Sequence, residues 1–321
     1  MESGLRLVFI ATGDIALPSF RHLLEHGPRP LVLVTQPDKP AGRHMTSAPS
    51  AIKIAAIEAG LPVLQPERIG DVMVQIGALN PDILVVMAYG QILRDNILTL
   101  PRRSIINLHA SLLPKYRGAA CIQAAIDAGD AETGVTSMHV VRELDAGDII
   151  LEKSVPIALD DTGGSLYERL SILATEVLVE TLGRLADGSA PRIPQDEKLA
   201  SYVPKLSRDD GRIDWNLTSL ALERRIRAYA PWPSTYTTVI GGEGAKRLKI
   251  YPPTVPMDKE LAPGIISCDG GRLIVGCGKG SLELISVQPE GGKRMSAADY
   301  LRGRNPVAGG SAHTEDYPRF C

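Results

Sequence analysis

The first half of the chain alternates short apolar runs with segments of helical length. The apolar runs that suit buried strands occupy residues 5–11, 31–35, 83–87 and 104–108. Ser50 is placed to cap a helix that Gly60 would end. Strands that alternate with helices are typical of βαβ units, so we predict an α/β domain built on a parallel sheet.

The second half changes character in two steps. Thr162 begins a long helical pattern that Asp187-Gly188 would end, and a polar, proline-containing segment follows. Beyond it, short apolar runs separated by glycine and proline occupy 234–240, 247–251, 264–267, 272–277 and 281–287, after one helix at 219–229. Short strands at this spacing predict a small β-barrel. We therefore expect domains at 1–189 and 208–305, a linker at 190–207, and a tail at 306–321 that lacks a pattern.

Composition narrows the class of protein. With 321 residues, 44% of them apolar and 22% charged, the chain has enough material for two folded domains. No apolar window is long enough to cross a membrane, and the first residues resemble no signal peptide, so we expect a cytoplasmic protein with no membrane partner. The four cysteines have no CxxC spacing, which argues against a disulfide framework or a zinc site.

The net charge of −2 hides an asymmetry. From Lys205 onward the chain carries 17 lysines and arginines against 13 acidic residues. A basic C-terminal part beside an acidic N-terminal part fits a polyanionic partner, and it equally fits two ordinary surfaces.

Candidate chemistry begins with Asn107 and His109, which follow a predicted buried strand. Residues i and i+2 of an extended segment point the same way, so the amide and the imidazole would project together at the carboxyl edge of the sheet. Both groups can donate to a developing oxyanion, and a neutral imidazole can instead accept a proton. The alternative is a histidine that only bonds a backbone carbonyl at a strand end.

Asp145 is one candidate acid for a place near His109, where a carboxylate would orient the ring and favour its charged form. Asp148 competes for this role, and the segment from 143 to 148 also reads as an ordinary turn. The apolar residues of 111–114 would either line a flat pocket or cover a core. Gly118 is expected to begin the next helix, whose N-terminus would favour an anion.

Several common signatures are missing from the sequence. It contains no GxGxxG, GxxxxGK[ST], GxSxG or HExxH pattern. We therefore expect no nicotinamide site, no nucleotide-phosphate cradle and no metal. His139 is interpreted as a packed strand residue.

Asn107–Gly118, together with Glu143–Gly147, resembles the signature of the folate-dependent formyltransferases. Further segments are similar to the branch of that family that acts on an aminoacyl-tRNA, and the resemblance covers residues 5 to 300. These segments are Thr35–Arg43, Val85–Gly90, Lys205–Ser207, Arg212–Trp215, Ala230–Pro233 and Met295–Ala297. The chain departs from the usual family pattern at Ala11–Gly13, at Cys121, where a proline is usual, and at His44–Thr46, where some relatives are more basic.

The resemblance implies a Rossmann-like domain at 1–189 that binds 10-formyltetrahydrofolate, and an OB-like domain at 208–305 that binds tRNA. It makes Asn107, His109 and Asp145 the catalytic residues. The residues it places against the folate are Ser111, Leu112, Leu113 and Pro114, with Met87, Ala88, Tyr89, Gly90 and Ile92 lining the pterin pocket.

The implied reaction is direct transfer of the formyl group to the free α-amino group of methionyl-initiator-tRNA, by a monomer without a metal. Expected tRNA contacts are Arg43, Lys205, Arg208 and Arg224. Two alternatives stay open at this point. One is the same chemistry on an amino sugar nucleotide or another small amine, and the other is a hydrolase that releases formate from the same folate.

Overall fold

The computed structural model describes residues 4–38, 40–41, 46–93, 95–241, 244–302 and 319–320. Contacts divide the chain into two compact units. The N-terminal unit comprises residues 1–121, 132–156 and 167–203, and the C-terminal unit comprises 122–131, 157–166 and 204–321. Arg43 and most of the predicted tail lie outside the described residues.

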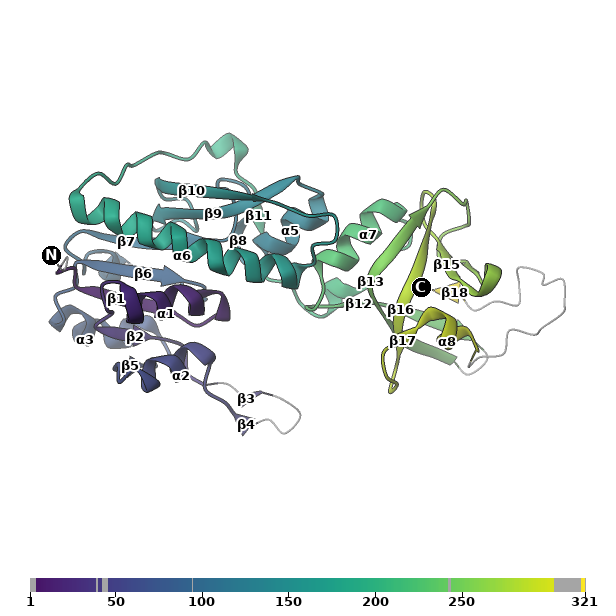
Figure 1. Cartoon of the computed structure of the whole chain (residues 1–321), viewed down its shortest axis with the longest axis horizontal. Helices are drawn as coiled ribbons and strands as arrows, with labels where there is room; N and C mark the ends of the chain where they lie inside the picture. The colour runs from purple at the N-terminus through teal and green to yellow at the C-terminus, as the bar shows by residue number, and fades with distance from the viewer. Residues whose placement is uncertain are drawn as a thin grey trace. The chain divides into compact units, whose positions relative to one another are not determined.

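The N-terminal unit is built on a seven-stranded sheet with the order β10-β9-β7-β6-β1-β2-β5 (Figure 1). Its strands are β1 (Leu7–Ala11), β2 (Val32–Val34), β5 (Val63–Leu64), β6 (Ile83–Met87), β7 (Ser104–His109), β9 (Glu132–His139) and β10 (Ile149–Pro156). The five strands from β5 to β7 are parallel, as predicted. The other two, β9 and β10, add an antiparallel edge that the sequence pattern did not predict.

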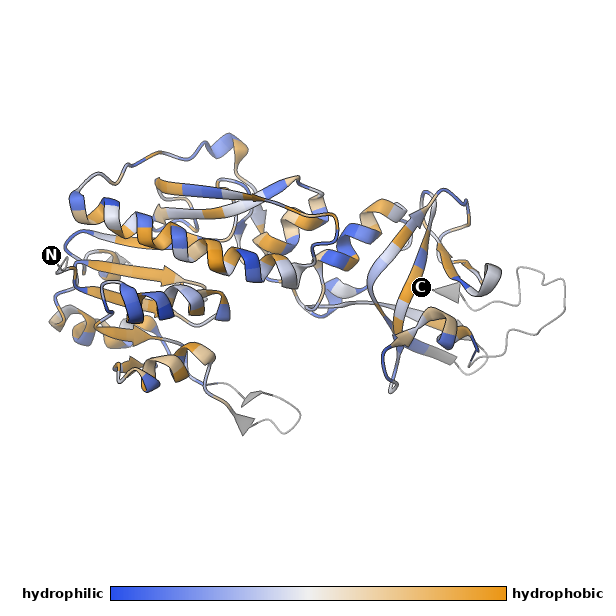
Figure 2. Cartoon of the chain, in the orientation of Figure 1, coloured by the Kyte–Doolittle hydropathy of each residue, from blue (hydrophilic) through white to orange (hydrophobic). Residues whose placement is uncertain are grey.

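Helices bury both faces of this sheet, which explains why its central strands read as continuous apolar runs (Figure 2). On one face the ring of Phe9 lies 5.2 Å from that of Phe20. On the other, Val8 and Ile10 belong to the same core cluster as Ile76. The α-helices involved are α1 (Leu17–His26), α2 (Ala51–Glu58), α3 (Met73–Ala78), α4 (Asp95–Leu98) and α6 (Gly163–Asp187).

The predicted helix boundaries are confirmed at several points. Ser50 caps α2 by accepting a hydrogen bond from the backbone N–H of Lys53, and Gly60 beyond its end has a φ of 65°. The prediction that Gly118 begins a helix is wrong. Gly118 lies in β8 (Arg117–Gly118), and α5 (Cys121–Ala128) starts three residues later.

Shorter elements complete the N-terminal unit. They are β3 (Pro40–Ala41), β4 (Thr46–Ser47), β11 (Tyr202–Val203) and the 3-10 helices η1 (Asp14–Ala16), η2 (Ile69–Val72) and η3 (Glu197–Leu199). Part of the predicted linker is ordered in this unit, because β11 pairs with β8 and Ile193 bridges to Ile149.

The C-terminal unit contains a curled antiparallel sheet with the order β14-β15-β16-β13-β12-β18, and β17 pairs with β16. Its strands are β12 (Thr235–Gly241), β13 (Gly244–Met257), β14 (Ile266–Ser267), β15 (Leu273–Gly276), β16 (Ser281–Pro289), β17 (Met295–Ser296) and β18 (Arg319–Phe320). Helices α7 (Ser219–Ala228) and α8 (Ala297–Arg302) and the 3-10 turns η4 (Asp209–Gly211) and η5 (Asp269–Gly271) accompany them. The OB-like architecture predicted for this part is confirmed. No helix among the described residues of either unit is long and apolar enough to cross a membrane.

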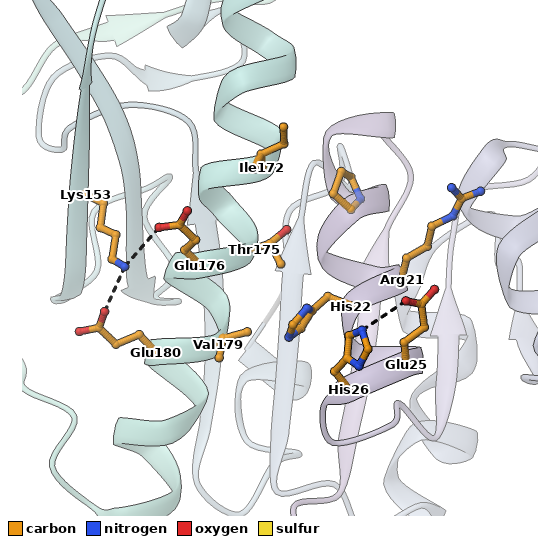
Figure 3. A pocket seen from close by; sticks show the side chains of 11 residues that line it. Arg21, His22, Glu25, His26, Lys153, Ile172, Thr175, Glu176, Val179 and Glu180 are labelled. Atoms are coloured by element: carbon orange, nitrogen blue, oxygen red, sulfur yellow. Dashed lines mark ion pairs between the residues drawn. The ribbon is translucent and has the colours of Figure 1, made fainter.

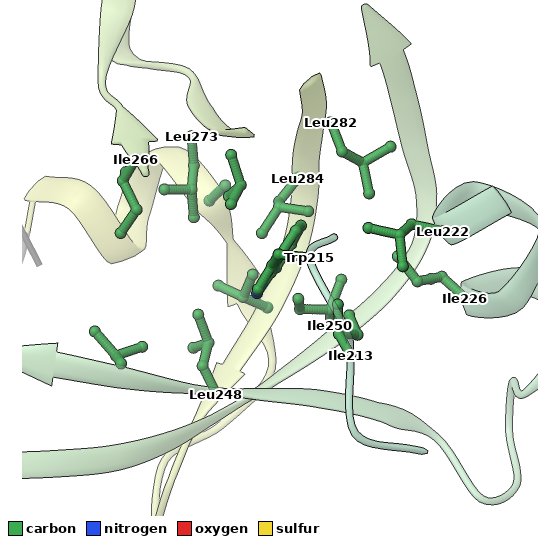
Figure 4. Packing of buried hydrophobic residues seen from close by; sticks show 14 of the residues in the cluster. Ile213, Trp215, Leu222, Ile226, Leu248, Ile250, Ile266, Leu273, Leu282 and Leu284 are labelled. Atoms are coloured by element: carbon green, nitrogen blue, oxygen red, sulfur yellow. The ribbon is translucent and has the colours of Figure 1, made fainter. Parts of the chain in front are cut away.

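Trp215 lies inside the apolar core of this sheet (Figure 4). It is 4% exposed, and its indole Nε1 donates a 3.0 Å hydrogen bond to Thr237 Oγ1. We expect Trp215→Ala to lower the free energy of unfolding by about 3–5 kcal/mol. The substitution removes the packing of the indole ring and its hydrogen bond, and it leaves a cavity in the core. Denaturant unfolding would measure the change. Trp232→Ala, at a tryptophan that is 49% exposed, should cost about 0.5 kcal/mol or less. Equal costs at the two positions would contradict the assignment of Trp215 to the core.

Candidate active site

Asn107, His109 and Asp145 come together at the carboxyl edge of the sheet. The Asn107 amide Nδ2 donates to Asp145 Oδ1 at 3.3 Å, and His109 Nδ1 lies 3.7 Å from Asp145 Oδ2. Asn107 and His109 sit two residues apart on β7, so their side chains share one face as predicted. Asp148 is not part of the group, because its carboxylate faces Arg192 at 3.5 Å.

The Asp145 carboxylate has a further donor in the backbone. The N–H of Gly118 donates to Asp145 Oδ2 at 2.8 Å, so each carboxylate oxygen accepts at least one hydrogen bond. Gly118 has a φ of 109°, and a Cβ at this position would lie 2.3 Å from the carbonyl oxygen of Val203. Only glycine fits this backbone, which brings its N–H within reach of the carboxylate.

The His109 ring is almost fully buried, and both of its nitrogens face acceptors. Nε2 donates to the carbonyl of Tyr116 at 2.9 Å, while Nδ1 faces Asp145. Burial is the largest influence and opposes the charged ring. The Cys121 sulfur, the Asp145 carboxylate and the Tyr116 carbonyl outweigh it and raise the pKa of His109 to about 9. The ring is therefore an imidazolium at neutral pH.

Cys121 contributes to this charged state through its contact with the ring. We expect Cys121→Ala to lower the pKa of His109, because it removes one of the groups that raise it. Titration of the imidazole C–H resonances by NMR would measure the shift, with His109→Asn used to assign the signal. Cys268→Ala, at a cysteine of the C-terminal unit, should leave the His109 titration unchanged. An unchanged pKa in Cys121→Ala would show that the sulfur does not act on the ring.

The segment predicted to contact the folate is partly buried in the core and partly exposed. Ser111 is fully buried, and its hydroxyl donates to the carbonyl of Lys115 at 2.7 Å. Leu113 covers a core cluster with Met138 and Ile149. Leu112 and Pro114 stay partly exposed, so they are the members of this segment that a ligand could contact.

The segment predicted to line the pterin pocket also contains both buried and exposed residues. Met87 and Tyr89 are buried, whereas Ala88, Gly90 and Ile92 are exposed. The buried Tyr89 hydroxyl has no hydrogen-bond partner among the described residues, and burial raises the pKa of Tyr89 to about 12. Ala88 and Gly90 both have positive φ angles, of 47° and 80°, so the chain turns sharply where β6 ends.

His139 is a packed strand residue, as predicted. It is 6% exposed, and its Nδ1 lies 2.8 Å from the hydroxyl of Ser104. Within the part of the chain that the structure describes, no three His, Cys, Asp or Glu side chains are arranged to hold a metal ion.

The basic residues expected to contact tRNA are placed in different surroundings. Lys205 and Arg208 are exposed. Arg224 is partly buried, and its Nη1 approaches the carbonyl of Ala128 at 3.5 Å. Their role stays a prediction, and Arg43 is not among the described residues.

A surface hollow of about 710 Å³ lies elsewhere in the N-terminal unit, between α1 and α6 (Figure 3). Lys153 reaches Glu176 and Glu180 from one side, at 3.5 and 3.3 Å, and His26 pairs with Glu25 on the other. None of the residues predicted for the reaction lines this hollow.

Sequence reasoning missed two side chains that support the site. Arg117 is 1% exposed, and Gln195 donates to the backbone carbonyls of Asp145 and Gly147. Arg117 lies within the segment Asn107–Gly118 that resembles the family signature, so its position could have marked it as important. Gln195 lies in a polar segment without periodicity, and nothing in the sequence pattern distinguishes it there.

Comparison with known proteins decides the family. Residues 8–182 match the model described as "Formyl transferase", and residues 205–305 match "Formyl transferase, C-terminal domain". The chain belongs to the formyl transferase family. Among relatives of this family, it is 47% identical to a methionyl-tRNA formyltransferase of Akkermansia muciniphila, over 93% of this chain and 96% of the relative. It is 43% identical to one of Geobacter metallireducens, over 94% and 96%.

Two solved structures share the fold at low identity. One is an N-formyltransferase from Helicobacter canadensis in complex with folinic acid and dTDP-3-aminofucose, with a TM-score of 0.65 and 17% identity over 91% of this chain and 100% of that chain. Another is HypX from Aquifex aeolicus in complex with tetrahydrofolic acid, with a TM-score of 0.61 and 16% identity over 93% of this chain and 47% of that chain.

Proposed function

We propose that this formyl transferase moves the formyl group of 10-formyltetrahydrofolate to the free α-amino group of methionyl-initiator-tRNA. The observation that carries the proposal is the likeness to methionyl-tRNA formyltransferases, at 43–47% identity over 93–94% of this chain. The cluster of Asn107, His109 and Asp145 supplies the chemistry that such a transfer needs.

Asn107 and His109 are the donors that we assign to the formyl oxygen. Because His109 Nε2 is already bonded to the Tyr116 carbonyl, the ring would donate through Nδ1, whose 3.7 Å distance to Asp145 Oδ2 is too long for a hydrogen bond. When the free amine adds to the formyl carbon, negative charge develops on that oxygen, and preorganised N–H groups stabilise it. An amide nitrogen carries two N–H groups, so the 3.3 Å bond from Asn107 to Asp145 leaves a second N–H for the oxyanion. Collapse then breaks the bond from the formyl carbon to N10, and the proton that the amine loses balances the proton that N10 gains.

Asp145 acts through His109 in this scheme. Because its carboxylate helps to raise the pKa of His109 to about 9, the ring is charged at the pH where the substrate amine is already partly neutral. The α-amine of an aminoacyl ester is less basic than a lysine, so no strong general base is required. The imidazolium stabilises the oxyanion and can lend its proton during collapse.

The folate would bind along the carboxyl edge, beside both of the segments assigned to it. Tyr89 supports this assignment, because its buried hydroxyl has no partner among the described residues and stays protonated. Leu112, Pro114 and Ile92 offer accessible apolar surface to a flat ring. The Aquifex aeolicus and Helicobacter canadensis proteins are described with related folates, which fits a folate co-substrate here.

The tRNA would be held by basic side chains, among which Arg43 is the clearest candidate from sequence. We expect Arg43→Ala to weaken tRNA binding and to reduce the slope of log affinity against log salt by about one, as one phosphate contact would require. Filter binding at several salt concentrations would measure both. Arg169→Ala, at an arginine that donates to the carbonyl of Pro156, is the matched control. Unchanged affinity and slope in Arg43→Ala would remove Arg43 from the interface.

Formyl transfer from labelled 10-formyltetrahydrofolate tests the proposed function directly. Charged initiator tRNA, charged elongator tRNA and no acceptor are compared side by side, with an amino sugar nucleotide as a fourth arm. Label on initiator methionine alone is the expected result. Folate turnover without an acceptor would identify a hydrolase, and label on the sugar would replace the tRNA assignment.

A further inference from the structure

Arg117 is a buried guanidinium whose five N–H groups all have acceptors. Nε and Nη2 donate to Gln195 Oε1 at 3.1 and 2.8 Å, and Nη1 and Nη2 donate to the two carboxylate oxygens of Glu197 at 3.0 and 2.7 Å. Nη1 also donates to the hydroxyl of Tyr202 at 2.7 Å. All three partners belong to the segment that the sequence predicted as a linker, so this segment is anchored to the catalytic motif at one buried cation.

Gln195 has a single possible orientation in this arrangement. Its Oε1 faces the Arg117 donors, and its Nε2 donates to the carbonyl of Asp145 at 2.9 Å and to that of Gly147 at 2.8 Å. A flipped amide would turn N–H groups toward the guanidinium and an oxygen toward two carbonyls. Arg117 therefore fixes the amide, and the amide fixes the loop that carries Asp145.

That loop needs an external support. Asp145 has a φ of 52°, a left-handed conformation that is uncommon for a residue other than glycine. Gly147 lies so close to β9 that a Cβ would be 1.7 Å from the carbonyl oxygen of His139. The two bonds from Gln195 hold both ends of this turn, and the position of the Asp145 carboxylate follows from its backbone.

The same segment reaches the other partners of His109. Ser201 Oγ accepts from the N–H of Tyr116 at 2.8 Å, and the Tyr116 carbonyl accepts from His109. Gly118, whose N–H binds Asp145, is paired with Val203. Residues 195–203 thus place the acceptors on both sides of the His109 ring.

We propose that Gln195, oriented by Arg117 and Glu197, is a positioning residue for formyl transfer that fixes Asp145 against Asn107 and His109. The expected effect on kcat rests on the proposed function. The expected effect on the pKa of His109 does not depend on it. Gln195 contacts no reacting atom. Its loss should therefore act on the chemical step and on the titration of His109, with little effect on the binding of either substrate.

Gln195→Leu and Gln195→Glu test the inference together. The leucine keeps the approximate size and removes every hydrogen bond, while the glutamate keeps acceptors for Arg117 but turns an oxygen toward the carbonyls of Asp145 and Gly147. We expect each to lower kcat about 10–100-fold with both KM values within about twofold of wild type. The pKa of His109, read by NMR, should fall in both variants, and the alkaline limb of the kcat profile should move to lower pH with it.

Glu197→Gln provides a milder perturbation, because the Glu197 side chain is 68% exposed and Arg117 keeps its other partners. A smaller change in the same direction is expected. Gln288→Leu is the matched control. This amide of the C-terminal unit accepts from the Tyr251 hydroxyl at 2.6 Å and donates to the carbonyl of Gly292 at 2.9 Å, and its loss should leave kcat and the His109 titration unchanged.

The outcomes separate this inference from the proposed function. Wild-type kcat and an unmoved His109 titration in Gln195→Leu would overturn the inference while the function stands. A lower melting temperature with an unmoved pH profile would reduce Gln195 to a structural role and would also overturn it. If the wild type transfers no formyl group to methionyl-tRNA, the proposed function fails, and the His109 titration then decides the positioning of Asp145 on its own.

Discussion

Replacing Asn107 by alanine is expected to lower kcat about 10²–10³-fold and to leave the affinity for folate close to that of wild type. The reason is that one preorganised donor to the oxyanion disappears, and its interaction is stronger in the transition state than in the ground state. Single-turnover formyl transfer measures the chemical step, and equilibrium binding of the folate measures the ground state. His109→Ala should behave similarly, since it removes the second donor and the positive charge.

Asn216→Ala is a suitable control for this variant. Asn216 also donates from its amide to a carboxylate, that of Asp214 at 2.8 Å, but on an exposed part of the C-terminal unit. Its loss should leave kcat unchanged. Near-normal turnover in Asn107→Ala would remove Asn107 from the catalytic assignment, and a parallel loss in both variants would point to general destabilisation.

Asp145→Asn should lower kcat about 10²-fold and narrow the range of pH over which the enzyme works. Both carboxylate oxygens of Asp145 accept hydrogen bonds, from Asn107 and from the N–H of Gly118. An asparagine can accept at one of these positions only, and its NH₂ would face a donor at the other. The loop or the Asn107 amide must then shift away from its productive position.

The direction of the pH effect follows from the charge. In the proposed mechanism His109 acts as an imidazolium, which persists below its pKa of about 9, and Asp145 is one of the groups that raise this pKa. Removing the carboxylate lowers the pKa, so the alkaline limb of the profile moves to lower pH. A rate profile from about pH 6 to about pH 10 would show the shift. Asp148→Asn, at the neighbouring acid that faces Arg192, should leave the limb in place. An alkaline limb that stays where it is in Asp145→Asn would show that His109 is not controlled by this carboxylate.

The elements that the sequence predicted best are those whose burial leaves a simple pattern. Strand β6, with five buried residues in succession, and helix α6, with its repeating leucines, were predicted because each packs its apolar residues at one period. Strand β9 was predicted only at His139, because its remaining length buries Thr133, Thr136 and Ser137 alongside apolar residues. The Thr136 hydroxyl, for example, bonds the Ser111 carbonyl and Glu152, and no local sequence pattern predicts such distant partners.

The candidate site was likewise predictable only where a local sequence pattern exists. Asn107 and His109 could be paired from their spacing, because a strand alternates its side chains with a fixed period. Asp145 could be joined to them only through the family resemblance, since the pairing bridges 36 residues or more of chain. The supporting role of Gln195 could not be predicted, and for Arg117 the motif marked the position but not the role. Gln195 acts through hydrogen bonds to distant backbone carbonyls, and Arg117 acts through side chains that lie 78 residues or more further along the chain. Both sets of contacts depend on the folded path of the chain and not on residue type.

The two edges of the N-terminal sheet have a bearing on how copies of this protein meet one another. An open sheet exposes unpaired backbone groups at each end, which invite strand addition by a second chain. Here β5 is only two residues long, and β10 changes register between Ile149 and Leu151, carries Lys153 and ends at Pro156. Short length, a bulge, a charge and a proline each discourage edge-to-edge pairing. We therefore expect both edges of the sheet to resist aggregation by strand pairing between chains, including at the high protein concentrations used in refolding.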